Sequence, residues 1–269
     1  MKFIRFLLFP FAIIFWLITS LRNKLFDLNV LKYVSFDLPV ICIGNLRVGG
    51  TGKTPMVEFL ISKFKDDYEI ATLSRGYGRE TEGFLKAGSQ SDSHEIGDEP
   101  LQLHRKYGHE VDVFVCEDRV LAVPEILRTN DTINLILLDD AFQHRYIKAG
   151  LNLVLTGYDK LFYRDFILPT GLLRESPYGA KRSDIIVVTK CPKSLDEDEK
   201  RRITRGIQFY SGKNKPVFFS SIEYAKAKNF DHEDSDLEGK EILLVTGLAN
   251  PQPFITYVSS EFKVSKELH

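Results

Sequence analysis

The stretch GNLRVGGTGKT, residues 44–54, contains residue types that can hold a nucleotide. Glycines allow backbone angles that turn consecutive N–H groups toward phosphate oxygens. We expect Lys53 to reach the β- and γ-phosphates and the Thr54 hydroxyl to bind Mg²⁺. The residues predicted to contact the nucleotide here are Gly49, Gly50, Thr51, Gly52, Lys53 and Thr54.

The elements around the loop favour this interpretation, although Arg47 stands where the strict pattern G-x-x-x-x-G-K-[ST] has its first glycine. Residues 40–43, VICI, are typical of a buried parallel strand that leads into such a loop. Pro55 suits the first turn of a helix, and the apolar residues after it recur at roughly helical spacing. The alternative is an ordinary glycine-rich turn, but strand, loop and helix together favour a phosphate site.

A second apolar strand, ILLDD, ends in two carboxylates. Ligands gather at the carboxyl ends of the strands in parallel sheets, so we expect Asp139 and Asp140 beside the glycine loop and its Mg²⁺. Gln143 and His144 follow closely enough to face the same cleft, although a single histidine is more often structural than catalytic.

Three further segments combine turn residues with side chains that suit phosphate chemistry. Asp98 and Glu99, in IGDEP, are normal choices at the start of a helix, and local evidence alone favours a capping role. The segment SRGYGR is either a turn or a loop that offers Tyr77 to a ligand. In LPTGLLRE, Arg174 has the chemistry to clamp a phosphate.

Strand-like and helix-like runs alternate along the chain. This predicts an α/β fold: a parallel sheet of the phosphate-loop NTPase type with helices on both faces, plus a second, smaller α/β domain. The strand-like runs are residues 40–43, 69–74, 111–116, 133–140, 151–157, 184–190 and 241–247. The parts we predict are a membrane-associating helix over residues 1–28, a nucleotide-binding domain over residues 29–155 and a C-terminal α/β domain over residues 156–269.

The uncharged run FLLFPFAIIFWLITSL, residues 6–21, has basic residues on both sides. It is shorter than the about 20 residues that a spanning helix needs, and Pro10 would kink it. No A-x-A-like cleavage site follows, which disfavours a secretory signal. We therefore predict a helix that lies in or dips into a membrane surface, with a core helix of the first domain as the alternative.

The composition, 43% hydrophobic and 27% charged over 269 residues, is ordinary for a globular protein. A net charge of −1 gives no reason to expect a nucleic-acid partner. Cys42, Cys116 and Cys191 are odd in number and far apart. They are typical of thiols in a reducing compartment, and neither a disulfide framework nor a zinc site is predicted.

Six motifs occur in order along the chain: GNLRVGGTGKTP, SRGYGR, GDEP, LLDDAFQHR, LPTGLLRE and VTGLANPQPF. Together they resemble the tetraacyldisaccharide 4′-kinases, the lipid A kinases of Gram-negative bacteria. The resemblance spans nearly the whole chain, and the apolar N-terminal helix fits it. It implies two α/β domains joined by a short β linker. It also implies transfer of the ATP γ-phosphate to the 4′-hydroxyl of a tetraacyldisaccharide 1-phosphate, giving lipid IVA.

The resemblance further implies ATP and Mg²⁺ as cofactors and an acylated disaccharide 1-phosphate lipid as the partner molecule. The implied location is the cytoplasmic face of the inner membrane, with a peripheral or monotopic attachment and no protein partner.

The resemblance also implies a role for each motif residue. Asp98 of GDEP would be the general base on the sugar hydroxyl, and Lys53 would stabilise the transferring phosphoryl group. The other implied roles are metal binding by Thr54, Asp139 and Glu99, orientation of the metal and its waters by Asp140, lining of the nucleotide site by Gln143 and His144, phosphate contacts by Arg119 and Arg174, and substrate positioning by Tyr77.

The sequence departs from the family pattern in two places. Ala141 stands where the family usually has the glycine of DDGFQHR. The family also carries a DHH-containing motif near its end, whose histidine pairs with the GDEP aspartate, whereas this sequence ends at EFKVSKELH. His269 lacks the flanking aspartate and is not assigned that role, so we expect the chain to stop just short of the motif.

Two other interpretations remain. A nucleotide-dependent switch or metallochaperone-like NTPase also uses a GGxGKT loop, but its usual lysine before the double glycine is Val48 here. Lys190 is followed by Cys191 and Pro192, not by the aspartate of a guanine-binding N/T-K-x-D pattern. The third interpretation is a membrane adaptor that binds nucleotide without catalysis, which a lipid phosphorylation assay distinguishes from a kinase.

Overall fold

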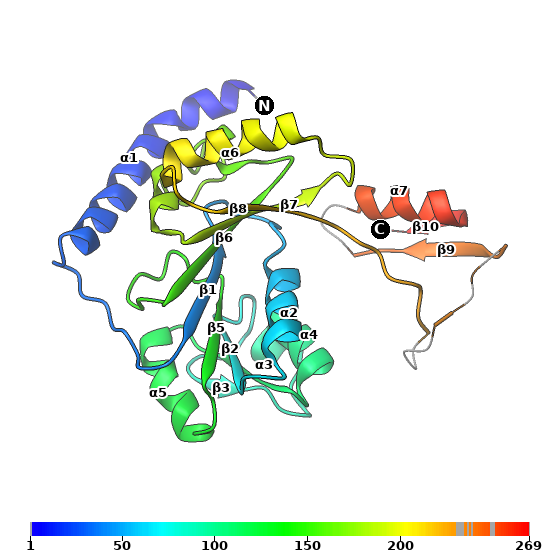
Figure 1. Ribbon diagram of the computed structural model, residues 1–269, viewed down its shortest axis with the longest axis horizontal. Coiled ribbons are helices and arrows are strands. Elements are labelled where there is room, and N and C mark those ends of the chain that lie inside the picture. The colour runs from blue at the N-terminus through cyan, green and yellow to red at the C-terminus, as the bar shows by residue number, and fades with distance from the viewer. Residues whose placement is uncertain (1, 230–233, 236, 238, 248–250, 269) are drawn as a thin grey trace. The chain divides into compact units, whose positions relative to one another are not determined.

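The chain contains two compact units. The computed structural model describes residues 2–229, 234, 235, 237, 239–247 and 251–268. The first unit spans Met1–Ile222 and the second Glu223–His269. The first is built on one eight-stranded sheet (Figure 1).

The sheet of the first unit has the strand order β3-β4-β2-β5-β1-β6-β7-β8, and only the pairing of β3 with β4 is antiparallel. The strands are β1 (Val40–Asn45), β2 (Ile70–Ser74), β3 (Leu85–Lys86), β4 (Val111–Val115), β5 (Leu135–Asp139), β6 (Leu151–Gly157), β7 (Ile185–Cys191) and β8 (Val217–Ser221). Because β1 lies between β5 and β6, the loops that follow these central strands meet at one edge of the sheet, where ligands gather in such folds.

Helices cover both faces of the sheet, as predicted (Figure 1). Successive residues of a strand point to opposite faces. Accordingly, Val40 and Cys42 of β1 belong to one core, and Ile41 and Ile43 belong to the other. The first core also contains residues of α5 (Arg119–Thr129), α6 (Glu197–Ser211), η1 (Phe162–Arg164) and η2 (Pro177–Arg182). The second contains residues of α2 (Lys53–Phe64), α3 (Ser93–Ile96) and α4 (Asp98–Tyr107).

The domain boundary expected between residues 155 and 156 falls inside β6. This strand pairs with β1 on one side and with β7 on the other, so β6, β7 and β8 continue the first sheet. The chain divides between Ile222 and Glu223 instead. Parallel strands that are buried on both faces have similar apolar sequences, which is why their pattern gave no sign of the sheet they join.

The second unit is a small βαβ arrangement, which agrees with the predicted smaller α/β domain in kind although it is shorter. It consists of β9 (Glu241–Val245), α7 (Gln252–Glu261) and β10 (Lys263–Leu268), with the two strands parallel. Its core is formed by Leu244, Ile255 and Val258. Residues 248–250 of the VTGLANPQPF motif and His269 lie outside the described residues.

Helix α1 (Lys2–Asp27) is long and apolar enough to cross a membrane by length and composition. It packs on the first unit through Ala12 and Phe26. Nine of its large apolar side chains are 43% to 63% exposed: Leu7, Phe9, Phe11, Ile13, Ile14, Trp16, Leu17, Ile18 and Leu21. A core helix would bury these side chains, whereas a contiguous exposed apolar face is typical of a membrane or partner surface. The helix therefore agrees with membrane association.

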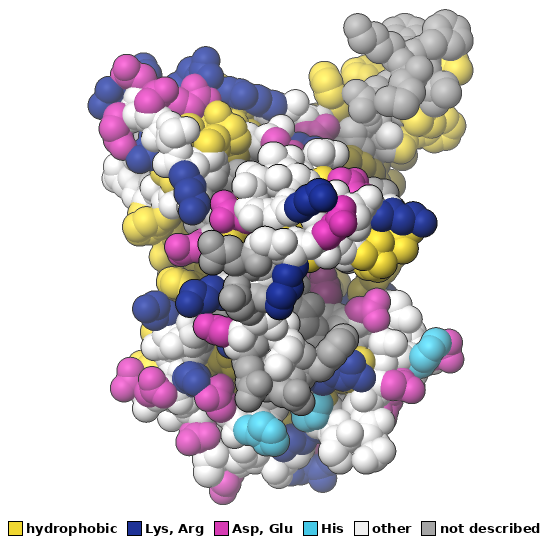
Figure 2. Space-filling view, turned by 90° about the vertical axis from the view of Figure 1, so that its right-hand side faces the viewer, with side chains coloured by type: hydrophobic (Ala, Val, Ile, Leu, Met, Phe, Trp, Pro, Cys, Tyr) yellow, Lys and Arg dark blue, Asp and Glu magenta, His cyan; other side chains and the backbone are white. Residues whose placement is uncertain are grey.

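Basic and acidic side chains are interspersed over the face shown in Figure 2. The mixture agrees with the net charge of −1. Charges of both signs at close spacing weaken the long-range field that steers a polyanion toward a surface.

Candidate active site

The loop that joins β1 to α2 has the shape of a phosphate-binding loop. Gly49 has φ 109° and Gly52 has φ 85°, a region of backbone conformation that other residues rarely adopt. Gly52 is the N-cap of α2, so Lys53 and Thr54 form its first turn. The free N–H groups and the positive end of the helix dipole therefore face the loop. The six residues predicted to contact the nucleotide are consecutive and form the end of this loop and the first turn of α2.

Three side chains that the sequence reasoning did not select brace this loop. Asn45 Nδ2 donates to Thr51 Oγ1 at 2.7 Å. Thr189 Oγ1 donates to the carbonyl oxygen of Thr51 at 2.8 Å, and Lys190 Nζ donates to that of Gly50 at 2.7 Å. Lys190 has φ 59°, and Thr189 with Lys190 closes an apolar strand. Thr189 and Lys190 could have been identified from the sequence, because they are two polar residues at the carboxyl end of a buried strand.

Lys53, Asp140 and Arg174 form a charged cluster at the carboxyl ends of β1 and β5. Lys53 Nζ lies 3.7 Å from Asp140 Oδ2. Arg174 donates from Nη1 to Asp140 Oδ1 at 2.8 Å and from Nη2 to Oδ2 at 3.0 Å, which makes a bidentate pair. Burial opposes ionisation of Asp140, but Arg174 and Lys53 outweigh it and hold the pKa of Asp140 below its ordinary value. Arg174 is thus fixed beside the loop by a carboxylate.

Gln143 connects this cluster to the glycine loop. Its Nε2 donates to the carbonyl oxygen of Asn45 at 2.8 Å, and its Oε1 accepts from Arg174 Nη1 at 3.2 Å. Gln143, Arg174 and Asp140 therefore form one hydrogen-bonded group.

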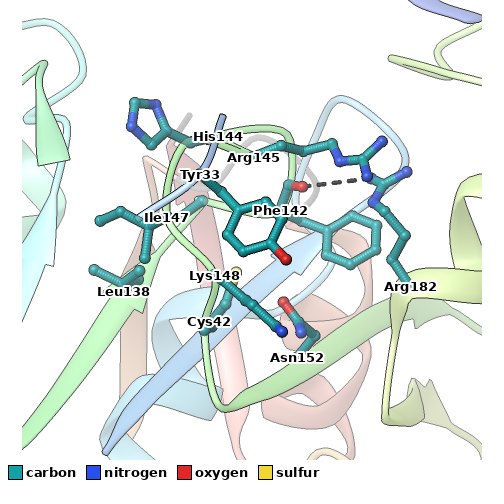
Figure 3. Close-up of a pocket in the computed structure, with 12 residues that line it drawn as sticks. Tyr33, Cys42, Leu138, Phe142, His144, Arg145, Ile147, Lys148, Asn152 and Arg182 are labelled. Carbon is teal, nitrogen blue, oxygen red and sulfur yellow. Dashed lines mark hydrogen bonds between the residues drawn. The ribbon is translucent and has the colours of Figure 1, made fainter. Parts of the chain in front are cut away.

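His144 points elsewhere. Its ring contacts that of Tyr146 at 5.8 Å between centroids, and its buried Nε2 has no hydrogen-bond partner within the described chain. Burial and the charge of Arg119 lower the pKa of His144 to about 4, so the ring is neutral at pH 7. In Figure 3 the ring points away from Phe142 and Lys148. The structure thus brings Gln143 into contact with the loop and leaves the predicted nucleotide role of His144 without such a contact.

A cavity of about 200 Å³ lies beneath the loop that follows β5 (Figure 3). Tyr33, Phe142 and Lys148 point into it, and Arg182 donates to the carbonyl oxygen of Phe142 at 3.4 Å. This contact ties η2 to the loop that carries Gln143.

Asp139 is the last residue of β5 and is only 2% exposed. Burial, with the charge of Glu99 adding to it, raises the pKa of Asp139 to about 7, against the opposing effect of Lys53. Asp139 Oδ1 is buried without a hydrogen-bond partner among the described residues. Leu101 of α4 and Leu137 of β5 belong to the same hydrophobic core.

The unpartnered oxygen of Asp139 has the chemistry to bind a magnesium ion. A buried carboxylate oxygen without a partner is costly, and a cation would satisfy it. No cluster of three or more His, Cys, Asp or Glu side chains forms a metal site in the part of the chain that the structure describes. Mg²⁺ needs only one or two carboxylates when nucleotide phosphates and waters complete its shell, so the predicted ligands Asp139, Glu99 and Thr54 are of the kind and number that such a site requires.

Asp98 begins α4, and the residues just before it fit closely against the loop that carries Tyr77. Gly97 has φ 90°, and a Cβ there would lie 2.9 Å from the carbonyl oxygen of Tyr77. Gly76 has φ 68°, and a Cβ there would lie 2.9 Å from that of Ile96. Only glycine permits this approach. Asp98 is exposed at the start of α4, and Tyr77 is 88% exposed, so both are accessible to a ligand.

Arg119 is the first residue of α5 and is 6% exposed. Its Nη1 donates to the carbonyl oxygen of Glu117 at 3.0 Å, and its buried Nε has no partner in the described chain. Burial and the neighbouring charge of Arg75 lower the pKa of Arg119, while Asp140 opposes that change. A buried guanidinium with an unused N–H suits the predicted phosphate contact.

Comparisons with known proteins agree with this geometry. The sequence profile of the family described as tetraacyldisaccharide-1-P 4′-kinase matches residues 4–269. A tetraacyldisaccharide 4′-kinase of Flavobacterium johnsoniae is 46% identical over 264 residues, which cover 97% of this chain and 77% of the relative. The enzyme of the same name from Bacteroides thetaiotaomicron is 42% identical over 262 residues, which cover 92% of this chain and 68% of the relative.

A solved structure supports the same assignment. The crystal structure of the "apo" form of LpxK from Aquifex aeolicus in complex with ATP superposes with a TM-score of 0.83 and 30% identity. The match covers 98% of this chain and 81% of that one. With the sequence profile, the relatives and the fold in agreement, this chain belongs to the tetraacyldisaccharide 4′-kinase family.

Proposed function

We propose that the residues around the glycine loop carry out the 4′-kinase reaction of lipid A biosynthesis with Asp98 as the general base. The 4′-oxygen of the acylated disaccharide 1-phosphate forms a bond to the γ-phosphorus of ATP. The bond from that phosphorus to the bridging oxygen breaks, ADP leaves, and the hydroxyl proton passes to the Asp98 carboxylate. The cluster of Lys53, Asp140 and Arg174 beside the loop carries this proposal.

The chain supplies mainly charge and position. The loop N–H groups and Lys53 stabilise the phosphate oxygens, and Arg119 adds a second cation at the start of α5. Arg174 is held by Asp140 and Gln143 before any ligand arrives, so little reorganisation is needed during transfer. The exposed phenol of Tyr77 positions the sugar beside Asp98.

Thr54, Asp139 and Glu99 would hold Mg²⁺, which would neutralise charge on the β- and γ-phosphates. Asp139 must be ionised to act as a ligand, and its pKa of about 7 leaves it partly protonated before a cation binds. Cation binding is therefore expected to release a proton.

The lipid substrate reaches this site at a membrane. The exposed apolar face of α1 supports docking on a bilayer, and the need for ATP supports the cytoplasmic face of the inner membrane. The 1-phosphate and the sugar would then lie in the headgroup region, with the acyl chains on the apolar side of α1.

The test is transfer of labelled phosphate from ATP to detergent-solubilised tetraacyldisaccharide 1-phosphate in the presence of Mg²⁺. Wild-type protein is expected to label the lipid, and Asp98→Ala is expected to lose the label. Asp92→Ala is the matched control, because Asp92 caps α3 by accepting from the N–H of Glu95 at 2.9 Å. Equal labelling by Asp98→Ala and Asp92→Ala would overturn the base assignment, and an inactive wild-type protein would overturn the function.

A further inference from the structure

Glu175 is a buried carboxylate that none of the roles above uses. It directly follows Arg174 and is only 3% exposed. A buried negative charge is costly unless several donors surround it, so its partners indicate what it does.

Glu175 accepts hydrogen bonds from three separate elements. Arg182, at the end of η2, donates from Nη1 and from Nη2 at 2.8 Å each. Gln143 Nε2 donates to Oε1 at 3.0 Å, and Asn23 Nδ2 of α1 donates to Oε2 at 2.7 Å. Burial alone would raise the pKa of Glu175, but these donors outweigh it and keep the pKa below its ordinary value. The carboxylate is thus ionised and fully used.

The bond to Gln143 determines which way that amide faces. Nε2 of Gln143 points at Glu175 and at the carbonyl oxygen of Asn45, so Oε1 is left to accept from Arg174. If the amide turned over, its oxygen would face the Glu175 carboxylate and its NH₂ group would face the Arg174 guanidinium. Both contacts would be repulsive, so the charge of Glu175 enforces the orientation that supports Arg174.

The same network includes the last turns of α1. Arg22 Nη2 donates to the carbonyl oxygen of Gln143 at 2.9 Å. Arg145 donates to the carbonyl oxygen of Asn23 at 2.8 Å and to Asp27 Oδ1 at 2.7 Å. The end of the membrane helix is therefore attached through polar contacts to the loop that carries Gln143.

We propose that Glu175 is a positioning residue for phosphoryl transfer, which couples the seating of α1, through Asn23, to the orientation of Gln143 and Arg174 at the glycine loop. This inference rests on the proposed function, because it assigns Glu175 a task only if Arg174 and Asp140 serve the transfer. Glu175 would act through Gln143, which contacts both Glu175 and Arg174.

The test compares five variants by kcat and KM in the lipid phosphorylation assay and by thermal stability. Glu175→Gln keeps the shape but presents an NH₂ group toward its donors. We expect kcat to fall about 10- to 100-fold, as small displacements in an active site do, with KM for ATP within about threefold. Glu175→Asp retains the charge and is expected to recover part of kcat. Asn23→Ala is expected to lower kcat severalfold, and to add little in a Glu175→Gln background.

Asn130→Ala is the control for a purely structural effect. Asn130 Nδ2 donates to Asp112 Oδ2 at 3.0 Å at the amino ends of the strands, opposite the glycine loop. Its loss is expected to lower Tm without lowering kcat. If Glu175→Gln does not fold, Asn23→Ala with the Asn130→Ala comparison decides the question.

Wild-type kcat in folded Glu175→Gln, or in Asn23→Ala, would overturn the inference while the proposed function stands. A decrease in kcat that simply follows the decrease in Tm, as in Asn130→Ala, would also overturn it. A wild-type protein that does not phosphorylate lipid would overturn the proposed function, and the inference with it.

Discussion

Replacing Asp139 with Asn should stabilise the nucleotide-free protein at pH 8 while it abolishes lipid phosphorylation. Asp139 is 2% exposed, and burial with the charge of Glu99 raises its pKa from 3.8 to about 7. Asparagine has the same shape and no charge. The substitution therefore removes an ionisation that the folded protein opposes but that the reaction requires.

The direction in which pH changes the stability follows from proton binding by Asp139. The unfolded chain releases the proton of Asp139 near pH 4, whereas the folded protein keeps it to about pH 7. Stability is therefore lost as pH rises through this window, and the loss is complete above it. A difference of about three pH units, at about 1.4 kcal/mol each, makes the loss about 4 kcal/mol. For a chain of this size this corresponds to roughly 10 °C in Tm.

Thermal unfolding followed by circular dichroism, in EDTA and without nucleotide, measures the effect at pH 5 and pH 8. Wild-type protein should melt roughly 10 °C below Asp139→Asn at pH 8 and only about 4 °C below it at pH 5. Asp140→Asn is the matched control with the opposite sign, because Arg174 and Lys53 hold the pKa of Asp140 low. Removing the negative charge of Asp140 should lower Tm at pH 8. Equal melting of wild-type protein and Asp139→Asn at pH 8 would refute the reasoning.

Two substitutions and one vesicle titration test other parts of the molecule. Gly97→Ala should lower kcat at least about tenfold with unchanged ATP affinity, because its Cβ would lie 2.9 Å from the Tyr77 carbonyl oxygen; unchanged kinetics would contradict the close fit. Lys190→Met should weaken ATP binding about fivefold in a calorimetric titration, since the Gly50 carbonyl oxygen loses its hydrogen bond. Trp16, the single tryptophan, should shift its emission to shorter wavelengths when anionic vesicles are added, and a constant spectrum would argue against docking of α1.

The local pattern of the sequence was sufficient to predict that a glycine loop joins a strand to a helix and that the paired aspartates follow a buried strand. Arg47 broke the strict motif, yet the strand, the small residues and the helix start were all present, and their physical roles do not depend on that position. Arg47 instead pairs with Asp165 at 2.7 Å, a long-range contact that no local pattern contains.

Other features depend on contacts between distant segments. The sequence around Glu175 resembles that of a surface turn. The donors that surround its carboxylate come from α1 and η2, and the local sequence does not reveal them. His144 sits one residue from Gln143, but the two side chains leave the turn in different directions, which residue spacing outside a helix or strand does not determine. The extent of the first sheet was also not predicted, because the apolar sequence of a strand does not determine which other strands it pairs with.

Helix α1 is anchored by polar contacts at its last turns and carries no charged residue from Phe6 to Leu21. At 1.5 Å per residue, about 10 Å separates Trp16 from Asn23. Once the apolar part enters a bilayer, the length of the helix between Trp16 and Asn23 sets the distance of the glycine loop from the acyl chains. Acceptors are then selected by depth as well as by chemistry, since only a hydroxyl at that height meets the γ-phosphate. One residue inserted between Trp16 and Asn23 would turn the apolar face by about 100° against the catalytic loops.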